Sequence, residues 1–543
     1  MITFIQPLIA KWLIRRYRWL AFGIIAAMKT AIKSLPNDVE KLKALLLSER
    51  HSSAQKDVEI KTLQEKNQYL LEQFRLAQHK QFGKSSEAHP GQGELFNEAE
   101  HLLDEVVEQV SGTDTTQSNN NKPKRKPLPK DLPREIRVVD IPKEDKVCDG
   151  CGHDLHQMGE KKSEQLKFIP AQVKVIETLR PQYSCRHCEK TATQVQIKIA
   201  PVPLSPIPKS IATPSLLAQI ITNKYQYSLP LYRQETMFKQ HGIEINRKTA
   251  SEWVIKCSTL FKPLVEYLHQ QLLTQPVIQA DETPLKVINE DKAKCYMWVY
   301  CSGTDSPKEH GNKNIVLYDY QPSRAGQCAV DYLQGFSGIV QADGHKGYDK
   351  LENPLIGCMA HARRKFIEAQ QAQPKNKTGR ANWATNHIKK LYRIEKDIKD
   401  LSADEKKTIR QEKSEPLLRE FKAWLDKSAK QVLPKSAIGV AINYTLNQWH
   451  KLIGYIESGE TNIDNNRAER AVKPFVIGRK NWLFSNTANG ANASAILYSV
   501  IETAKANGLT PFNYLMFLLE ELPKKLGDLD YLMPWNVQLE AVI

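Results

Sequence analysis

Two short apolar segments of this chain end in the same tripeptide, Gln-Ala-Asp. They are PVIQAD at 276–281 and GIVQAD at 338–343. A short apolar run of this kind, followed by a charged residue, is typical of a buried strand. The sequence therefore predicts two strands, each of which presents a carboxylate, Asp281 or Asp343, at its C-terminal tip.

Further strands and helices surround these two segments in a definite order. Apolar runs at 295–302, 314–320 and 354–360 predict three more strands, and helical patterns follow the third strand and Cys358. The order is strand, strand, strand, helix, strand, short helix, strand, helix, which is the order of the ribonuclease-H-like fold. In that fold the first and fourth strands are neighbours, so Asp281 and Asp343 are expected side by side.

A third acidic residue, Glu469, lies in the segment DNNRAERAVKPF, which we expect to be a helix packed against the sheet. Carboxylates that converge from separate elements can hold two divalent ions for phosphoryl transfer. Oxygen ligands favour Mg²⁺, with Mn²⁺ as a substitute. The alternative for each acid is a solvated surface residue, and Glu457 and Glu460 are nearby alternatives to Glu469. Basic residues near Glu469 predict phosphate contacts: Arg467, Arg470, Lys473, Arg479 and Lys480.

The charged, helical stretch 371–462 interrupts this pattern, and we interpret it as an insertion. The predicted core therefore has a first part at 263–370 and a second part at 463–490, and residues 491–543 form a C-terminal helical domain. The fold class is multidomain α+β. At 543 residues the chain is too long for a single hydrophobic core.

Four of the nine cysteines form two CxxC pairs within a small segment, 136–200. Each CxxC turn presents two thiolates from one tight bend, and two such turns complete a tetrahedral site. We therefore predict a ribbon with one structural Zn²⁺ ion; reduced cysteines without metal are the alternative. The predicted ligands are Cys148, Cys151, Cys185 and Cys188. An odd number of cysteines with this spacing suits a reducing, cytoplasmic location.

Residues 201–262 are mostly helical in pattern and resemble a helix-turn-helix DNA-binding segment. The predicted recognition helix carries Arg247, Lys248, Ser251 and Trp253 near its start, where base and phosphate contacts would fall. A helical linker would show a similar pattern. The net charge of +16 also suits DNA as a partner, although a basic protein without such a partner remains the alternative.

The N-terminal quarter, residues 1–135, divides into three predicted segments. Residues 1–27 are interpreted as upstream sequence before a start at Met28, with a membrane-surface helix as the alternative; their longest apolar run is too short to span a bilayer. Residues 28–82 contain one long helix, in which heptad counting from Val39 predicts a coiled coil rather than a lone amphipathic helix. Residues 83–135 are polar and rich in proline, which is typical of a linker.

Several long motifs, taken in order, resemble the large transposase of the insertion sequence 66 family over residues 35–540. They are FGKSSE (82–87), the two CxxC pairs, KYQYSLPLYRQE (224–235), QADETPLKV (279–287), QADGHKGY (341–348), CMAHARRKF (358–366) and NNRAERAVKPFVIGRKNWLF (465–484). The resemblance implies a DDE-type triad at Asp281, Asp343 and Glu469. It also implies a zinc-finger segment, a leucine-rich N-terminal helix and a small C-terminal domain.

This resemblance implies an enzyme that binds the terminal inverted repeats of its element, cleaves DNA and joins the freed 3′ end to target DNA. Assembly as a homo-oligomer on paired ends is expected, and two small accessory proteins are implied. A catalytically silent repressor of the element and a structure-specific nuclease are the alternatives; a coiled-coil scaffold would leave the acidic strands unexplained.

Two further motifs are ambiguous. Cys358-x2-His361 follows the fifth strand, where packing or a contact between the sheet and the insertion is favoured over a metal role. Trp482 could stack on an unpaired base at a cleaved DNA end, with core packing as the favoured alternative.

Overall fold

The computed structural model describes residues 38–82, 173–183, 198–290, 292, 294–303, 313–373, 379–525, 527–537 and 539. The described residues belong to two compact units. The larger unit comprises 38–82, 205–231 and the described part of 248–539; the smaller comprises 173–183, 198–204 and 232–247. The predicted upstream segment, the linker and all four predicted zinc ligands lie outside the described residues.

A five-stranded sheet with the order β5-β4-β3-β6-β7 forms the centre of the larger unit. β3 (Val277–Leu285) pairs antiparallel with β4 (Cys295–Ser302) and parallel with β6 (Ile339–Gln341). The outer strands are β5 (Ile315–Gln321) and β7 (Leu355–Ile356). The prediction that the first and fourth strands are neighbours is therefore confirmed.

β3 is longer than predicted, which changes the position of Asp281. The expected strand ended at this aspartate, but β3 continues to Leu285 because residues 282–285 pair with β4. Asp281 is consequently a mid-strand residue opposite Val299, whereas Asp343 lies two residues beyond the end of β6. Since successive side chains of a strand point to opposite faces, Asp281 and Glu282 project to different sides of the sheet.

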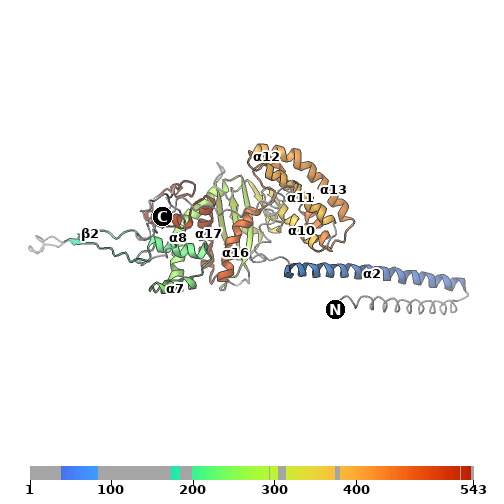
Figure 1. Cartoon of the computed structure of the whole chain (residues 1–543), viewed down its shortest axis with the longest axis horizontal. Coiled ribbons are helices and arrows are strands. Elements are labelled where there is room, and N and C mark those ends of the chain that lie inside the picture. Colours follow the sequence, from blue (N-terminus) through green and yellow to red (C-terminus); the bar gives the residue numbers. More distant parts are fainter. Residues whose placement is uncertain are drawn as a thin grey trace, which may run out of the picture. The chain divides into compact units, whose positions relative to one another are not determined.

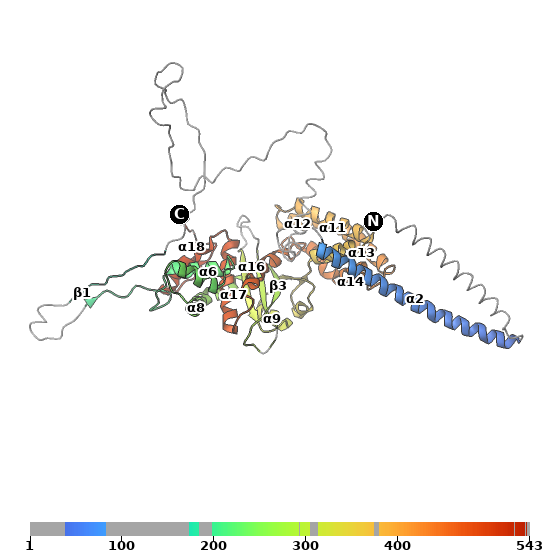
Figure 2. The ribbon, with the colours of Figure 1, turned by 60° about the horizontal axis from the view of Figure 1, so that its bottom comes forward.

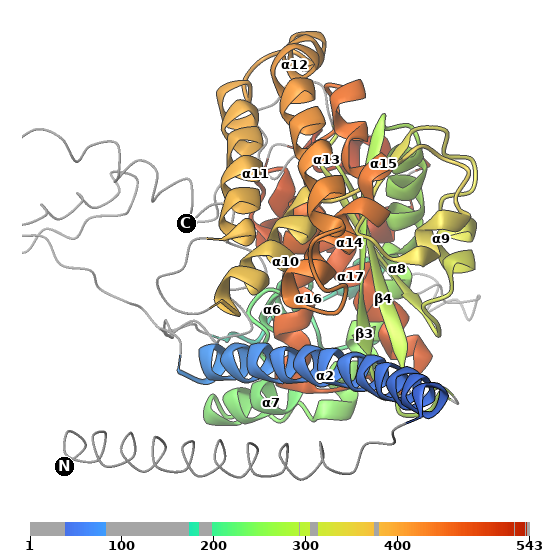
Figure 3. The ribbon, with the colours of Figure 1, turned by 90° about the vertical axis from the view of Figure 1, so that its right-hand side faces the viewer.

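Helices cover both faces of the sheet (Figure 3). On one face lie α16 (Asn466–Trp482) and α17 (Ala488–Ala506), where Tyr318 of β5 packs against Phe475 and Tyr498. On the other face lie α9 (Gly326–Tyr332) and the second half of α8 (Arg247–Leu273). There the Tyr332 ring stacks on Tyr300 of β4. The sequence analysis predicted that the segment around Glu469, in the second part of the core (463–490), forms a helix packed against the sheet. α16 is this helix.

α17 also protects the outer edge of β5. The Ser499 hydroxyl accepts a hydrogen bond from the Tyr318 backbone N–H across 2.8 Å, and the Thr503 hydroxyl bonds both backbone groups of Val316. Side-chain hydroxyls thus satisfy backbone groups that an edge strand leaves unpaired. The predicted boundary at residue 490 lies inside α17, so this helix packs as part of the sheet unit.

The predicted helical insertion, residues 371–462, contains α11 (Arg380–Asp397), α12 (Ala403–Ile409), α13 (Glu415–Ala429), α14 (Ala437–Asn447) and α15 (Trp449–Leu452) (Figure 1). The preceding helix α10 (Met359–Gln371), which the sequence analysis assigned to the first part of the core, packs against α11 and α14. α10, α11, α13, α14 and α15 share a core of buried apolar side chains around Phe366 and Phe421, to which α12 contributes no buried residue. Two stacked tryptophans, Trp383 and Trp424, pack against this core.

The predicted N-terminal helix is α2 (Val39–Phe82), whose C-terminal part contacts α10 and α14 (Figure 2). The Glu72 carboxylate accepts a hydrogen bond from the Ala437 N–H at the start of α14, and Arg75 donates to the Ala372 carbonyl at the end of α10. Each charge thus meets the helix terminus of opposite polarity. Many large apolar residues of α2 are exposed, Val39 at 63% and Leu63 at 57% among them. A coiled coil with a second chain stays a prediction.

The predicted helical segment 201–262 contains α6 (Pro214–Tyr225), α7 (Leu231–Gln240) and the start of α8. α8 runs through residue 262 without interruption because its buried face continues with Leu264, Leu268 and Leu272. In the smaller unit, β1 (Gln182–Tyr183) pairs antiparallel with β2 (Lys198–Ile199). No helix among the described residues combines the length and the apolar character that crossing a membrane requires.

Candidate functional site

Three elements bring the predicted acidic residues to one face of the sheet. Asp281 shares its face of β3 with Thr283, whose hydroxyl accepts a hydrogen bond from Arg479 of α16 across 3.2 Å. Gln279, on the same face, donates to Gln341 of β6, two residues before Asp343. Glu469 lies in the first turn of α16 and is 3% exposed. In contrast, the alternatives Glu457 and Glu460 are exposed before α16 begins.

The three acids lie close enough for the charge of one to act on the ionisation of another. Desolvation raises the pKa of Asp281 well above its ordinary value, and the charges of Glu282, Asp343 and Glu469 raise it further. Burial raises the pKa of Glu469 to about 7; Asp464 and Asp343 add to this rise, while Arg364 opposes it. Neighbouring carboxylates disfavour one another's ionised form, and a bound cation removes that penalty.

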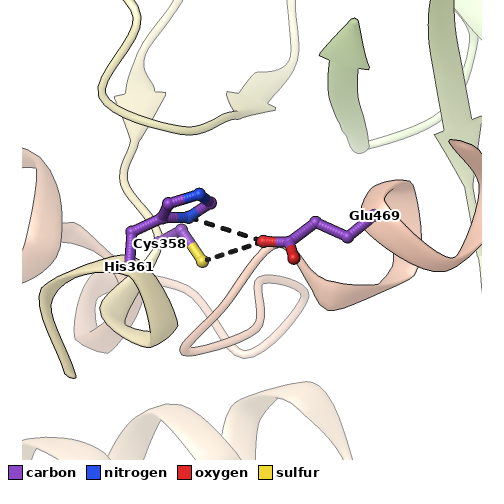
Figure 4. A group of neighbouring side chains, drawn as sticks. All are labelled: Cys358, His361 and Glu469. Carbon is purple, nitrogen blue, oxygen red and sulfur yellow. Dashed lines mark hydrogen bonds and ion pairs between the residues drawn. The ribbon is translucent and has the colours of Figure 1, made fainter. Parts of the chain in front are cut away.

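Glu469 has three further polar neighbours on or beside α10, two of which, Cys358 and His361, are drawn in Figure 4. Its Oε1 lies 3.4 Å from His361 Nδ1 and 4.0 Å from Cys358 Sγ. Its Oε2 accepts a hydrogen bond from Arg364 across 3.3 Å. Burial and the charge of Arg364 lower the pKa of His361 to about 4, so this imidazole is neutral at pH 7.

Two donor sets therefore share Glu469. The carboxylates of Asp281, Asp343 and Glu469 offer the oxygen ligands that Mg²⁺ prefers. The ligand atoms of Cys358, His361 and Glu469 all lie within 4.8 Å of one another, and a thiol with an imidazole suits zinc better than magnesium. The sequence favoured a contact between the sheet and the insertion for the Cys-x2-His pair. Cys358 Sγ accepts a hydrogen bond from the Asn465 N–H across 3.2 Å, which joins the end of the fifth strand to the start of the second part of the core.

A second network, which the sequence analysis missed, lies on the opposite face of β3. Glu282 is buried and pairs with Arg324 at 2.5 Å, and its other oxygen accepts a hydrogen bond from the Tyr348 hydroxyl at 2.6 Å. Tyr348 belongs to the short helix η2 (Lys346–Lys350), which follows Asp343. The His345 N–H donates to the Asp343 carboxylate across 2.8 Å. Glu282 thus holds in place the loop that carries Asp343. In the sequence, the only indication of a role for Glu282 was that it directly follows Asp281.

Two of the residues predicted to contact DNA are buried instead. Arg467 is 4% exposed and donates to the Ser302 carbonyl at 2.7 Å, so its guanidinium faces the sheet. Trp253 is 6% exposed because it lies on the buried face of α8. A helix carries its charged residues on several sides, and composition alone does not tell which side is covered.

The other predicted DNA-contacting residues have different degrees of exposure. Arg247, Lys248 and Lys480 are exposed, while Arg470, Lys473 and Arg479 are half-buried. Trp482 is half-buried as well, with its ring edge against Phe475 at a centroid distance of 5.5 Å. The favoured alternative for Trp482, core packing, is therefore the observed arrangement.

Comparisons with known proteins assign the chain to a family. A model described as "Transposase IS66 family" matches residues 209–493, which is more than half of the chain. The chain therefore belongs to the IS66 transposase family. Other matches are "zinc-finger binding domain of transposase IS66" at 145–189, which includes all four predicted zinc ligands, "Transposase C of IS166 homeodomain" at 69–137 and "IS66 C-terminal element" at 499–535. These matches support zinc in the finger and DNA as a partner.

Relatives of this chain occur in Sinorhizobium fredii. The uncharacterized protein y4jD is 33% identical over 433 residues, which cover 76% of this chain and 82% of that protein. The uncharacterized protein y4hP is 30% identical over 456 residues, covering 80% and 81% of the two chains. The uncharacterized protein y4qI is 28% identical over 557 residues, covering 95% of this chain and all of that protein.

Proposed function

We propose that this protein is a DNA transposase with a ribonuclease-H-like core. It binds the terminal inverted repeats of its element and uses Asp281, Asp343 and Glu469 to cleave a strand and transfer the freed 3′ end to target DNA. The observation that carries this proposal is the convergence of three carboxylates from two adjacent strands and a covering helix, where burial first and then neighbouring carboxylates raise the pKa of Asp281 and Glu469.

The donor set fits magnesium, because the carboxylates of Asp281 and Glu469, whose pKa values are raised, gain from a divalent cation beside them. Bound magnesium would supply an activated water and stabilise the leaving 3′ oxygen. Within the chain, Arg364 holds one oxygen of Glu469 and keeps this carboxylate oriented. Glu282 and His345 hold the loop of Asp343 in place from the other face of the sheet. Lys480 offers an exposed charge for the DNA backbone.

The rest of the chain supports assembly on DNA. The proposed zinc ligands are Cys148, Cys151, Cys185 and Cys188, and the proposed helix-turn-helix contacts are Arg247 and Lys248. The exposed apolar residues of α2 suit pairing of two chains, which places two catalytic cores on paired ends. Free thiols at all five cysteines within the described residues are in keeping with a cytoplasmic location.

The test is cleavage of a labelled duplex that carries the element's own terminal repeat. We expect nicking at the repeat end with magnesium, none with chelator and none with Asp281→Asn. Glu457→Gln serves as the control, because this acid is exposed and lies outside the cluster. The neighbouring small proteins of the element are added in a parallel reaction.

Two results would support the rival functions. Tight binding without cleavage in every reaction would favour the repressor. Cleavage of branched DNA without any joining of ends would favour a structure-specific nuclease.

A further inference from the structure

Two large apolar residues are exposed where α16 ends, at the opposite end of this helix from Glu469. Leu483 is 66% exposed and Phe484 is 42% exposed. They follow Lys480 and Trp482 directly in the sequence. Trp482 packs inward on Phe475, so these two residues, and not the tryptophan, present the apolar surface at this end of the helix.

The backbone at Leu483 is strained. Its φ is +66°, a left-handed conformation that a bulky residue other than glycine rarely adopts. Glycine would remove the strain, and a polar side chain would suit the exposure. The sequence has neither. Strain of this kind persists when the surrounding structure holds the residue in place, and it is concentrated at functional sites.

The segment after Leu483 is fastened to the loop that follows β3. The Ser485 N–H donates to the Lys286 carbonyl, and the Ile288 N–H donates to the Ser485 carbonyl, each across 3.0 Å. Ile288 is itself 47% exposed. Leu483 and Phe484 therefore project from a braced turn at the end of the strand that carries Asp281.

The surroundings of this turn are basic. Lys286 and Lys480 are exposed, and Arg479 hydrogen-bonds Thr283, two residues beyond Asp281. A small apolar tip between cations, at the end of the helix that carries Glu469, matches the chemistry of opened DNA: phosphates meet the cations, and unstacked base faces meet the apolar side chains.

We propose that Leu483 and Phe484 form an apolar wedge that contacts the unstacked bases of a DNA end while the scissile strand reaches the acidic cluster. The proposal rests on the proposed transposase function for its biological setting. Its physical content is a binding preference for DNA whose end is unpaired over fully paired DNA. A second copy of this chain, or another protein, would not require the flanking cations.

The test compares two duplexes of equal length that share one sequence and differ only in a few unpaired bases at one end. The full-length protein is titrated into each in chelator, with fluorescence anisotropy as the readout. A 2-aminopurine at the fork junction reports unstacking directly. The variants are Leu483→Gly, Phe484→Ala and their combination. Leu483→Gly accepts the φ of +66° without strain, so its thermal unfolding temperature is retained and a loss of binding cannot be attributed to misfolding.

We expect the wild type to prefer the forked duplex and the double variant to lose about tenfold of that preference, which corresponds to one stacked base. Binding to the paired duplex should stay unchanged. Val440→Ala, which removes an apolar side chain that is 46% exposed on the insertion, should behave like the wild type.

Three results would overturn the wedge. They are a wild type without preference for the fork, a double variant that keeps the preference, and a double variant whose only change is in self-association. If the wild type fails to cleave its own repeat but the double variant still loses the fork preference, the wedge stands and the catalytic proposal fails.

Discussion

Replacing Glu469 by glutamine should stabilise the metal-free protein at alkaline pH. Glutamine imitates the protonated carboxyl group, which is the form that the buried site favours. The pKa of Glu469 is raised from 4.5 to about 7 in the folded chain. Between these values the unfolded chain has released its proton and the folded chain has not, so the free energy of unfolding falls as the pH rises.

The magnitude follows from the size of this shift. Each pH unit between 4.5 and 7 costs about 1.4 kcal/mol, which sums to roughly 3 kcal/mol above pH 7 and to almost nothing below pH 4.5. At about 2 °C per kcal/mol for a large domain, the unfolding temperature of Glu469→Gln should exceed that of the wild type by roughly 6 °C at pH 8.

The assay is thermal unfolding in chelator at pH 5 and pH 8, at one heating rate, with Glu457→Gln as the exposed control. Adding magnesium at pH 8 should raise the unfolding temperature of the wild type more than that of Glu469→Gln, since the cation relieves the same repulsion. A gap between wild type and variant that is equal at the two pH values would refute the reasoning. So would a variant that is less stable than the wild type at pH 8.

Three further outcomes are expected. Arg467→Ala should lower the unfolding temperature and leave the DNA affinity of the folded protein unchanged, because Arg467 is buried. Lys480→Ala should weaken DNA binding and reduce the slope of log affinity against log salt by about one. Equal effects of the two variants on DNA binding would contradict the burial of Arg467. In the folded chain Arg410 pairs with the Glu395 carboxylate at 2.6 Å, and Arg410→Met removes this partner. The free energy of unfolding, measured in urea, should fall by about 3–5 kcal/mol. A smaller fall would mean that Glu395 reaches water in the variant. Metal analysis of the purified chain should find about one zinc per chain, and Cys148→Ser should lose this zinc. If Cys148→Ser keeps the zinc and Cys358→Ser loses it, the zinc is bound by the cluster of Cys358, His361 and Glu469 instead.

The sheet and the acidic residues were predictable because their signals are local. β3 and β6 are buried strands, so each appears in the sequence as a short apolar run. The charged residue that follows each run is the aspartate, Asp281 or Asp343. The network of Glu282, Arg324 and Tyr348 was not predictable, since its members are at least 24 residues apart and meet only when the sheet forms. The length of β3 was missed for a related reason: residues 282–285 extend because β4 pairs with them, not because of their composition.

The hydrogen bond from Asn465 to Cys358 has a consequence for how the gene can change. It brings together the two ends of the segment 359–464. A second hydrogen bond, from the Met359 N–H to the Ile463 carbonyl, joins the same two ends. The entropy of closing a loop grows only with the logarithm of its length, by about 0.6 kcal/mol for each doubling. Even as an unstructured loop, this stretch of 106 residues (359–464) would oppose closure by only about 2 kcal/mol more than one an eighth as long. Helices can thus be added to or removed from this region over evolutionary time, or a foreign domain can be inserted there by design. The two ends of the segment would still meet beside Glu469.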